Sequence, residues 1–396
     1  MTQEYRKVYL KKDEEKRIQK GEVWVYDNEL AGDIRGFSPG EVVKLYSSRD
    51  GYIATGFINP QSAITFRVLS RNIEDVIDRA FFRERIYRAD EQRQAIHPEN
   101  RCYRMVFSEA DGLPGLVIDR FQDYVVVQVT AAGMEQVKTD IFDIIAELYP
   151  GCTLVEKSTG GARQKEGLPP LTREITPNRP MATVVDINGV KFNLDFLKSQ
   201  KTGFFLDQRE NYLLLRNICK GKEVMDIFSY AGAWGLHAYH YGAKRVEFLE
   251  ASSPYLEQTR ENILLNGFSL EDFSFLQADA LVALKELSQG EPHKDVVILD
   301  PPAFIKSAAK AKQGMRGYHE VNLRALKMVK PGGFFVSCSC SHFFSRDDFL
   351  WVIHRAALDI KRSVKLLTFN TQPYDHPILL PLFPSEYLKC ALFAVH

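Results

Sequence analysis

The chain has 396 residues, of which 45% are hydrophobic and 26% charged, and this suits a globular protein of two or three domains. Its 51 lysines and arginines balance 51 aspartates and glutamates, so the net charge neither indicates nor excludes a nucleic-acid partner. We expect no membrane association, because no apolar run could span a bilayer and the N-terminal segment lacks a signal peptide's apolar stretch.

The first segment, residues 1–72, is predicted to form a small β-barrel. Its short runs EVWVYDNEL, GEVVKLYSS, YIATGFIN and ITFRVLS are rich in β-branched and aromatic residues. Turn dipeptides separate them: Pro39-Gly40, Asp50-Gly51 and Asn59-Pro60. From its lysine-glycine entry to its Asn-Pro turn, this segment resembles PUA-type RNA-binding domains, and the resemblance implies RNA binding.

The second segment, residues 73–180, is predicted to be an α+β domain. A charged helical stretch at 73–96 precedes two or three strands around an Asp111-Gly112 turn, a helix near 134–148 and the strand-like run CTLVEKS. The run GGARQKEGLPP then predicts a loop. Arg163 and Lys165 in this loop are candidate phosphate contacts, although solvated surface charges are the simpler interpretation of each.

The third segment, residues 181–396, alternates strands and helices. Strands are predicted at 223–228, 244–249, 273–277, 295–299 and 333–338, each followed by a helical pattern. This alternation predicts an α/β fold with a doubly wound, Rossmann-like parallel sheet. The runs VKLLTFN and EYLKCALFAVH add an antiparallel hairpin at the sheet edge. Such sheets bind ligands beyond the carboxyl ends of their strands, so we expect the chemistry there.

Acidic residues end four of these strands. Asp226 precedes a turn of small residues that includes Gly232, whereas a dinucleotide site would need G-x-G-x-x-G there. A carboxylate at this point suits the sulfonium and amino group of S-adenosylmethionine better than a pyrophosphate. Glu250 is placed to accept the ribose hydroxyls and Asp279 the adenine amino group. Any one of these acids could instead cap a helix, but four in register, Asp300 being the fourth, indicate a methyl-donor pocket.

These motifs carry a family resemblance. DIFSYAGAWG, FLEAS, QADA and LDPPAF resemble the motifs of class I S-adenosylmethionine-dependent methyltransferases. With KTGFFLDQREN, SCSCSH and DHPILLPLFPSEYLK, and with the PUA-like N-terminus, nearly the whole chain resembles bacterial large-subunit ribosomal RNA (cytosine-C5) methyltransferases of the RlmI type. The resemblance implies an enzyme that binds ribosomal RNA. We expect it in the cytoplasm, because six cysteines without metal-ligand spacing suit a reducing compartment, and we expect a monomer or homodimer. The resemblance also implies further donor contacts from Gln208, Arg209, Phe228, Ser229, Tyr230 and Ser252.

Two cysteines end the fifth strand. Methylation at cytosine C5 needs a thiolate that adds to C6, beside a carboxylate such as Asp300 that stabilises the protonated ring. Cys338 and Cys340 share a face, so strand periodicity cannot choose between them. Cys340 lies further past the strand end, where a thiolate forms more easily, and the family motif also aligns its nucleophile there. The predicted nucleophile is therefore Cys340, the alternative being that both thiols only pack. The six cysteines have no metal-ligand spacing, and we expect free thiols and no metal.

Two other functions remain open at this point. The run DPPAF also occurs in enzymes that methylate exocyclic amines, and this chain lacks the second cysteine that many RNA 5-methylcytosine enzymes carry there. Amine methylation predicts that activity survives the loss of both Cys338 and Cys340. A non-catalytic RNA-binding assembly factor predicts RNA affinity without donor binding.

Overall fold

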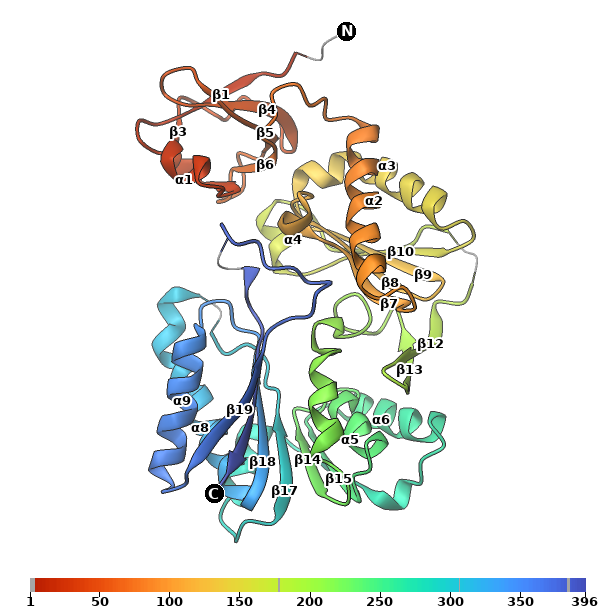
Figure 1. Cartoon of the computed structure of the whole chain (residues 1–396). Helices are drawn as coiled ribbons and strands as arrows, with labels where there is room; N and C mark the ends of the chain where they lie inside the picture. The colour runs from red at the N-terminus through yellow and green to blue at the C-terminus, as the bar shows by residue number, and fades with distance from the viewer. Residues whose placement is uncertain (1–3, 177–178, 306, 383–384) are drawn as a thin grey trace. The chain divides into compact units, whose positions relative to one another are not determined.

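The structure, a computed structural model, describes residues 4–176, 179–305, 307–382 and 385–396 (Figure 1). The chain forms two compact units, and it passes between them repeatedly. The first consists of Met1–Thr183, Leu194–Leu206 and Tyr374–Ser385, and the second of Val184–Asn193, Asp207–Pro373 and Glu386–His396. The domain boundaries proposed at residues 72 and 180 stay predictions.

The first unit begins with a six-stranded sheet in the order β2-β6-β5-β4-β1-β3. The strands are β1 Lys7–Leu10, β2 Trp24–Val25, β3 Leu30–Ala31, β4 Glu41–Tyr46, β5 Tyr52–Ile58 and β6 Phe66–Ser70. Val43, Leu45 and Phe66 are fully buried and form a separate hydrophobic core with Ile18 of helix α1 (Glu15–Gln19). This sheet confirms the β-rich N-terminal segment predicted from the sequence.

A second sheet of the same unit has the order β11-β10-β9-β8-β7. Its strands are β7 Cys102–Phe107, β8 Leu116–Phe121, β9 Tyr124–Val129, β10 Thr153–Ser158 and β11 Leu171–Glu174, and its helices are α2 Arg79–Ile96 and α3 Ala132–Leu148. Phe82 and Ile86 of α2 and Ile141 and Ile145 of α3 are buried against these strands. Helices packed on a mixed sheet confirm the predicted α+β character.

The expectation for Arg163 was wrong. The predicted loop contains a short helix, α4 (Gly161–Lys165), and the Arg163 side chain is only 1% exposed. Its guanidinium donates to the carbonyls of Pro169 (2.6 Å) and Val129 (3.0 Å) and pairs with Glu135 at 2.7 Å. Arg163 therefore stabilises the fold and cannot meet a phosphate, whereas Lys165 remains exposed.

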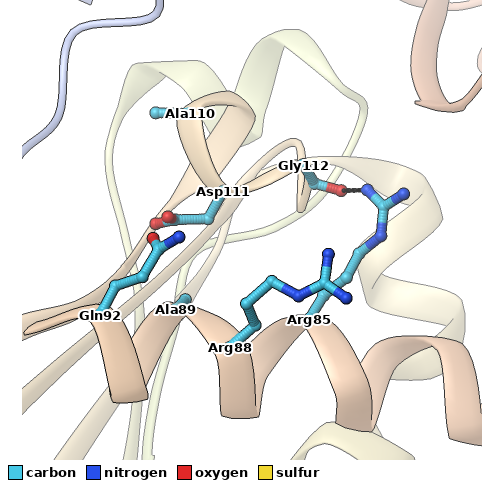
Figure 2. A pocket seen from close by; sticks show the side chains of 7 residues that line it. All are labelled: Arg85, Arg88, Ala89, Gln92, Ala110, Asp111 and Gly112. Carbon is cyan, nitrogen blue, oxygen red and sulfur yellow. Dashed lines mark hydrogen bonds between the residues drawn. The ribbon is translucent and has the colours of Figure 1, made fainter.

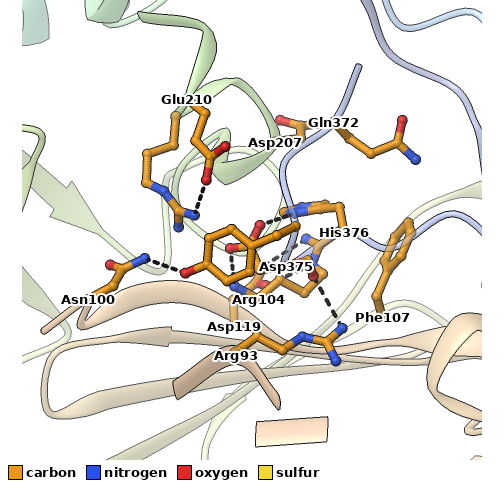
Figure 3. Close-up of polar contacts among 12 residues, drawn as sticks. Arg93, Asn100, Arg104, Phe107, Asp119, Asp207, Glu210, Gln372, Asp375 and His376 are labelled. Atoms are coloured by element: carbon orange, nitrogen blue, oxygen red, sulfur yellow. Dashed lines mark hydrogen bonds and ion pairs between the residues drawn. The ribbon is translucent and has the colours of Figure 1, made fainter. Parts of the chain in front are cut away.

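A segment near the C-terminus, Tyr374–Ser385, returns to the first unit and joins its second sheet through buried polar contacts (Figure 3). The Asp375 carboxylate accepts from the backbone N–H of Arg104 at 3.0 Å and meets His376 Nδ1 at 2.8 Å. The Asp375 carbonyl accepts from the Arg93 guanidinium at 3.3 Å. Because Asp375 and His376 are almost fully buried, the start of the DHPILLPLFPSEYLK motif has a structural role.

The second unit contains a seven-stranded sheet in the order β16-β15-β14-β17-β18-β20-β19. The strands are β14 Glu223–Ile227, β15 Arg245–Glu250, β16 Phe273–Gln277, β17 Lys294–Leu299, β18 Val329–Ser339, β19 Val364–Asn370 and β20 Lys389–Val395. The first five run parallel, and β20 lies antiparallel between β18 and β19. The predicted Rossmann-like sheet with an antiparallel edge hairpin is confirmed.

Helices cover both faces of this sheet (Figure 1). The helices are α5 Ala233–His240, α6 Ser253–Leu265, α7 Ala280–Leu287, α8 Ala311–Met328 and α9 Arg346–Asp359. The last three share one hydrophobic core with the sheet, while α5 approaches the other face so closely that a Cβ on Gly235 would lie 2.3 Å from the Phe248 ring. A separate two-stranded hairpin consists of β12 (Ala182–Ile187) and β13 (Val190–Asp195). The carboxyl ends of β14, β15, β17 and β18 thus meet at one edge.

Candidate active site

Asp226 lies inside β14, one residue before the strand ends, and is completely buried. Its Oδ2 accepts a hydrogen bond from the backbone N–H of Gly235 at 2.9 Å, in the first turn of α5. Burial, with smaller contributions from the nearby Asp300 and Glu250, raises the pKa of this carboxyl to about 8, against the lowering effect of the Gly235 hydrogen bond. A buried carboxyl of this kind is poised to become ionised when a cation binds beside it.

The loop after β14 has an unusual backbone. Phe228 (φ 63°) and Tyr230 (φ 49°) adopt the left-handed conformation that side chains other than glycine rarely tolerate. Gly232 follows with φ 79°, and a Cβ there would lie 2.6 Å from the Thr259 side chain. Such strained residues gather at ligand sites, where the surrounding structure fixes them in place. This loop is therefore built to hold a fixed shape for a ligand.

The carboxylates of the next two strands hold backbone groups. Glu250 accepts from the N–H of Tyr230 (3.0 Å) and from the N–H of Ser252 (2.9 Å), so it ties the strained loop to the start of α6. Asp279 is exposed and caps α7 by accepting from two backbone N–H groups, at 2.8 and 3.3 Å. The capping interpretation weighed for these acids thus describes Asp279, and its contact to adenine stays a prediction.

The residues of this loop fit the methyl donor. Asp226 Oδ1 and Ser229 Oγ are buried and make no hydrogen bond within the described residues. Buried polar atoms are normally satisfied, so these two atoms, one near the end of β14 and one in the strained loop that follows, suggest a missing polar ligand. A carboxylate and a hydroxyl match the ammonium and sulfonium charges of S-adenosylmethionine, and the contact of Glu250 to its ribose hydroxyls stays a prediction.

A chain of amide hydrogen bonds orients Asp300, which directly follows β17. Asp300 Oδ2 accepts from Gln208 Nε2 at 2.9 Å and from Trp234 Nε1 at 3.0 Å. Gln208 in turn accepts from Asn211 at 2.7 Å, and Asn211 accepts from Asn370 at 3.1 Å. Gln208 therefore orients the carboxylate of the strand-four motif, although the sequence resemblance gave it a contact to the donor.

Two of these residues were missed by the sequence reasoning. Trp234 stands inside the DIFSYAGAWG motif, where an indole among small residues was the available signal for a polar partner. Asn370 ends β19 and gave no signal, because its partner is 159 residues away in the chain. Arg209, expected at the donor, is 5% exposed, and its guanidinium lies 3.5 Å from the Glu210 carboxylate. Its donor contact stays a prediction.

Within β18, the side chains of Ser337 and Ser339 face one side of the sheet and that of Cys338 faces the other. The hydroxyls of Ser337 and Ser339 bind Asn322 (2.7 Å) and Tyr318 (2.8 Å) of α8. Cys338 points to the other face, where it is fully buried and pairs across the sheet with a further cysteine, Cys390. Burial, then Cys390 and then Asp300, raises the pKa of the Cys338 thiol well above its ordinary value. Cys338 therefore cannot readily become a thiolate.

Cys340 differs from the other cysteines. It lies one residue beyond the end of β18 and is partly exposed, whereas the other five cysteines are buried. The next residue, Ser341, is anchored by a contact between its hydroxyl and the Tyr318 hydroxyl at 2.9 Å. The segment that carries Cys340 is thus fixed at the carboxyl edge of the sheet, with its thiol accessible.

The first unit has a pocket of its own, with a volume of about 280 Å³, between α2 and the turn after β7 (Figure 2). Arg85 spans it by donating to the Gly112 carbonyl at 2.7 Å. Its lining consists of Arg85, Arg88, Ala89, Gln92, Ala110, Asp111 and Gly112. None of these is a nucleophile of the kind that β18 presents, so the second unit carries the candidate active site.

No helix among the described residues has the length and apolar character needed to cross a membrane.

Comparisons with known proteins agree with this geometry. Residues 8–71 match a PUA-like domain and residues 169–384 match an S-adenosylmethionine-dependent methyltransferase family. The ribosomal RNA large subunit methyltransferase I of Shewanella denitrificans is 33% identical over 97% of this chain and 98% of its own length. The protein of the same name from Photobacterium profundum is 34% identical over 96% of this chain and 97% of its own.

Solved structures show the same fold. An S-adenosylmethionine-dependent methyltransferase from Streptococcus mutans superposes with a TM-score of 0.84 at 20% identity, covering 98% of this chain and 100% of its own. A second methyltransferase structure, which holds S-adenosylhomocysteine, gives the same TM-score at 19% identity. With the family match over more than half of the chain and relatives aligned along nearly all of it, this chain belongs to the S-adenosylmethionine-dependent methyltransferases, in the ribosomal RNA large subunit methyltransferase I family with an N-terminal PUA-like domain.

Proposed function

We propose that this protein transfers a methyl group from S-adenosylmethionine to carbon 5 of a cytosine in large-subunit ribosomal RNA, with Cys340 as the nucleophile. The observation that carries the proposal is the placement of Cys340. It is a partly exposed thiol directly past β18, and Asp300 directly follows the neighbouring strand β17. The names of the relatives and the PUA-like domain support ribosomal RNA as the substrate, which the enzyme would meet in the cytoplasm.

Each site residue has a role in this reaction. Asp226, Glu250 and Asp279 would hold the donor together with Gln208, Arg209, Phe228, Ser229, Tyr230, Gly232 and Ser252. When bound, the donor supplies an electrophilic methyl group on a sulfonium sulfur. The Cys340 thiolate forms a bond to cytosine C6, and the C5–C6 π electrons become available at C5 for that methyl group, whose bond to sulfur would break with S-adenosylhomocysteine as the leaving group. Asp300 would hold the protonated side of the ring. Loss of the C5 proton to a base then restores the double bond and breaks the Sγ–C6 bond.

Covalent trapping tests the nucleophile. Ribosomal RNA that contains 5-azacytidine, incubated with the protein and S-adenosylmethionine, should give a denaturation-resistant protein–RNA adduct, because position 5 carries no proton whose loss could release the thiol. We expect Cys340→Ser to abolish the adduct. Cys338→Ser is the matched control, since it makes the same atomic change two residues away in the buried part of the strand, and it should retain the adduct.

The other outcomes discriminate between the alternatives. An adduct that is lost only with Cys338→Ser would show that Cys338, and not Cys340, is the nucleophile. Methyl transfer to ordinary RNA that survives both substitutions, without any adduct, would favour amine methylation at the DPPAF motif. RNA binding with no affinity for S-adenosylmethionine would favour a non-catalytic assembly factor.

A further inference from the structure

A buried lysine lies beside the proposed nucleophile. Lys389 begins β20 and pairs in register with Ser339, the last residue of β18. Its side chain is on the same face as the Ser339 hydroxyl, and the residue is only 2% exposed. The ammonium donates a hydrogen bond to the carbonyl of Ser341 at 2.8 Å. Lys389 therefore holds the residue that directly follows Cys340.

Burying this cation is unfavourable unless something compensates it. Lysine is rarely buried without an ionic partner, because removing the ammonium from water costs several kcal/mol. In the part of the chain that the structure describes, Lys389 has the hydrogen bond to Ser341 and no ion pair with a carboxylate. Burial lowers the pKa of Lys389 to about 8, so the side chain is still mostly charged at pH 7. An anionic group near this ammonium would therefore stabilise its charge.

Cys340 can provide that anion. Two titratable groups, Cys340 and Glu386, act electrostatically on the Lys389 ammonium, and both raise its pKa against the effect of burial. The thiol is also close enough to Tyr318, on the α8 side of the strand, to raise the pKa of its hydroxyl. The Cys340 thiol thus lies within electrostatic reach of both the Lys389 ammonium and the Tyr318 hydroxyl, and Lys389 itself holds the adjacent residue, Ser341. Of the two groups that act on Lys389, Cys340 is the one that has a role in the proposed reaction, so its thiolate is the relevant counter-ion for Lys389.

We propose that Lys389 is a positioning residue that stabilises the Cys340 thiolate by its charge and fixes the Cys340–Ser341 segment by its hydrogen bond. The inference deepens the proposed function and rests on it for its catalytic meaning. On deprotonation the thiol proton passes to solvent water through the exposed side of Cys340, and the ammonium keeps its own protons. An ion pair between the partly exposed thiolate and the buried ammonium is then added to the hydrogen bond with Ser341. Sequence reasoning had given Lys389 no role.

The test measures the acidity of the thiol directly, without donor or RNA. The rate of alkylation of Cys340 by iodoacetamide is followed from pH 5 to pH 10, with the modified peptide quantified by mass spectrometry. Since only the thiolate reacts, the midpoint of the profile is the thiol pKa. For the wild type we expect a midpoint below about 7.5, against about 8.5 for a free cysteine. Lys389→Met should raise the midpoint by about one unit or more, which lowers the rate at pH 7 about tenfold.

Two further variants separate charge from structure. Lys389→Arg keeps the positive charge and should restore the rate at pH 7 to within about threefold of the wild type. Lys157→Met is the matched control, because Lys157 is also buried, donates to a backbone carbonyl (that of Ser199) and has its pKa lowered to about 8 by burial, but belongs to the first unit. It should leave the Cys340 profile unchanged.

The outcomes are decisive even if Lys389→Met fails to fold, because the wild-type profile alone can overturn the inference. A wild-type midpoint at or above about 8.5 means that no thiolate stabilisation exists. An unchanged midpoint in folded Lys389→Met overturns it as well. A lowered midpoint that depends on Lys389, without an adduct on 5-azacytidine RNA, would support this inference and contradict the proposed function. If the adduct forms but the midpoint of the alkylation profile does not depend on Lys389, the proposed function is supported and the role of Lys389 is contradicted.

Discussion

Replacing Asp226 by asparagine should remove a proton that the wild type releases when S-adenosylmethionine binds. The free protein holds this buried carboxyl with a pKa of about 8, so about nine-tenths of the molecules carry the proton at pH 7. The cationic donor favours the carboxylate, because opposite charges attract strongly in a buried site. Binding at pH 7 should therefore release about 0.9 proton more from the wild type than from Asp226→Asn.

The sign of the pH dependence follows from the same linkage. Donor binding requires Asp226 to lose its proton, and the free-energy cost of this loss grows as the pH falls below 8, the pKa of Asp226 in the free protein. Below pH 8 the affinity of the wild type should therefore fall, relative to that of the variant, by up to about tenfold per pH unit. Isothermal titration calorimetry in buffers of different ionisation enthalpy measures both the affinity and the number of protons released. The difference between the wild type and the variant removes the contribution from titration of the ligand's own amine. Equal proton release by the two proteins, or wild-type binding that strengthens below pH 7 relative to the variant, would refute the reasoning.

Two further predictions concern the loop and the first unit. Gly232→Ala should both destabilise the second unit and abolish donor binding, because the new methyl group would lie 2.6 Å from the Thr259 side chain. The control is Gly221→Ala, which has a similar φ of 72° but open space around it, and it should cost only about 1 kcal/mol of stability and leave donor binding intact. Thermal melts and binding titrations measure both effects. Loss of binding in both variants would contradict the steric argument. Arg93→Met should destabilise the first unit by about 3–5 kcal/mol, because it leaves the buried Asp111 carboxylate without its ion partner at 2.7 Å. Arg88→Met on the same helix is the control, because it removes only the exposed pair with Glu84, which is worth at most about 1 kcal/mol. Urea unfolding followed by α2 fluorescence labels measures the difference, and equal effects would show that burial of the Arg93 pair is unimportant.

The sequence predicted the second unit's sheet well, because its signals are local. Each of the five parallel strands contains a short run of aliphatic or aromatic residues followed by a helical pattern, and these runs match the observed bounds within a few residues. The insertion of β20 between β18 and β19 could not be predicted, since two adjacent runs read equally well as a simple hairpin at the edge. Strand order at that end depends on pairings across the sheet, which no local pattern specifies.

Side-chain partners were harder to predict than strands. Arg163 lies in a glycine-rich run, so its sequence context indicates a solvated loop, but its guanidinium is buried by acceptors on Pro169, six residues away, and on Val129 and Glu135, which are more distant in the chain. Asp279 fits both a helix cap and a ligand contact, and the sequence alone offers no means of separating them. Cys340 was distinguishable from Cys338 because a strand end is a local feature. Lys389 was not recognised, since its significance depends on the register between β18 and β20.

The return of Tyr374–Ser385 to the first unit has a consequence for biosynthesis. The Arg93 guanidinium meets the Asp375 carbonyl across 282 residues of chain. At about 5–20 residues per second, a translating ribosome would need roughly 15–60 s to supply the second partner after the first. During that interval the nascent first unit lacks one of its buried segments, and six of the seven strands of the methyltransferase sheet, all except β20, are synthesised in between. Final locking of the N-terminal half is therefore delayed until translation is nearly complete, and a chaperone that protects the nascent chain would be needed most in that window.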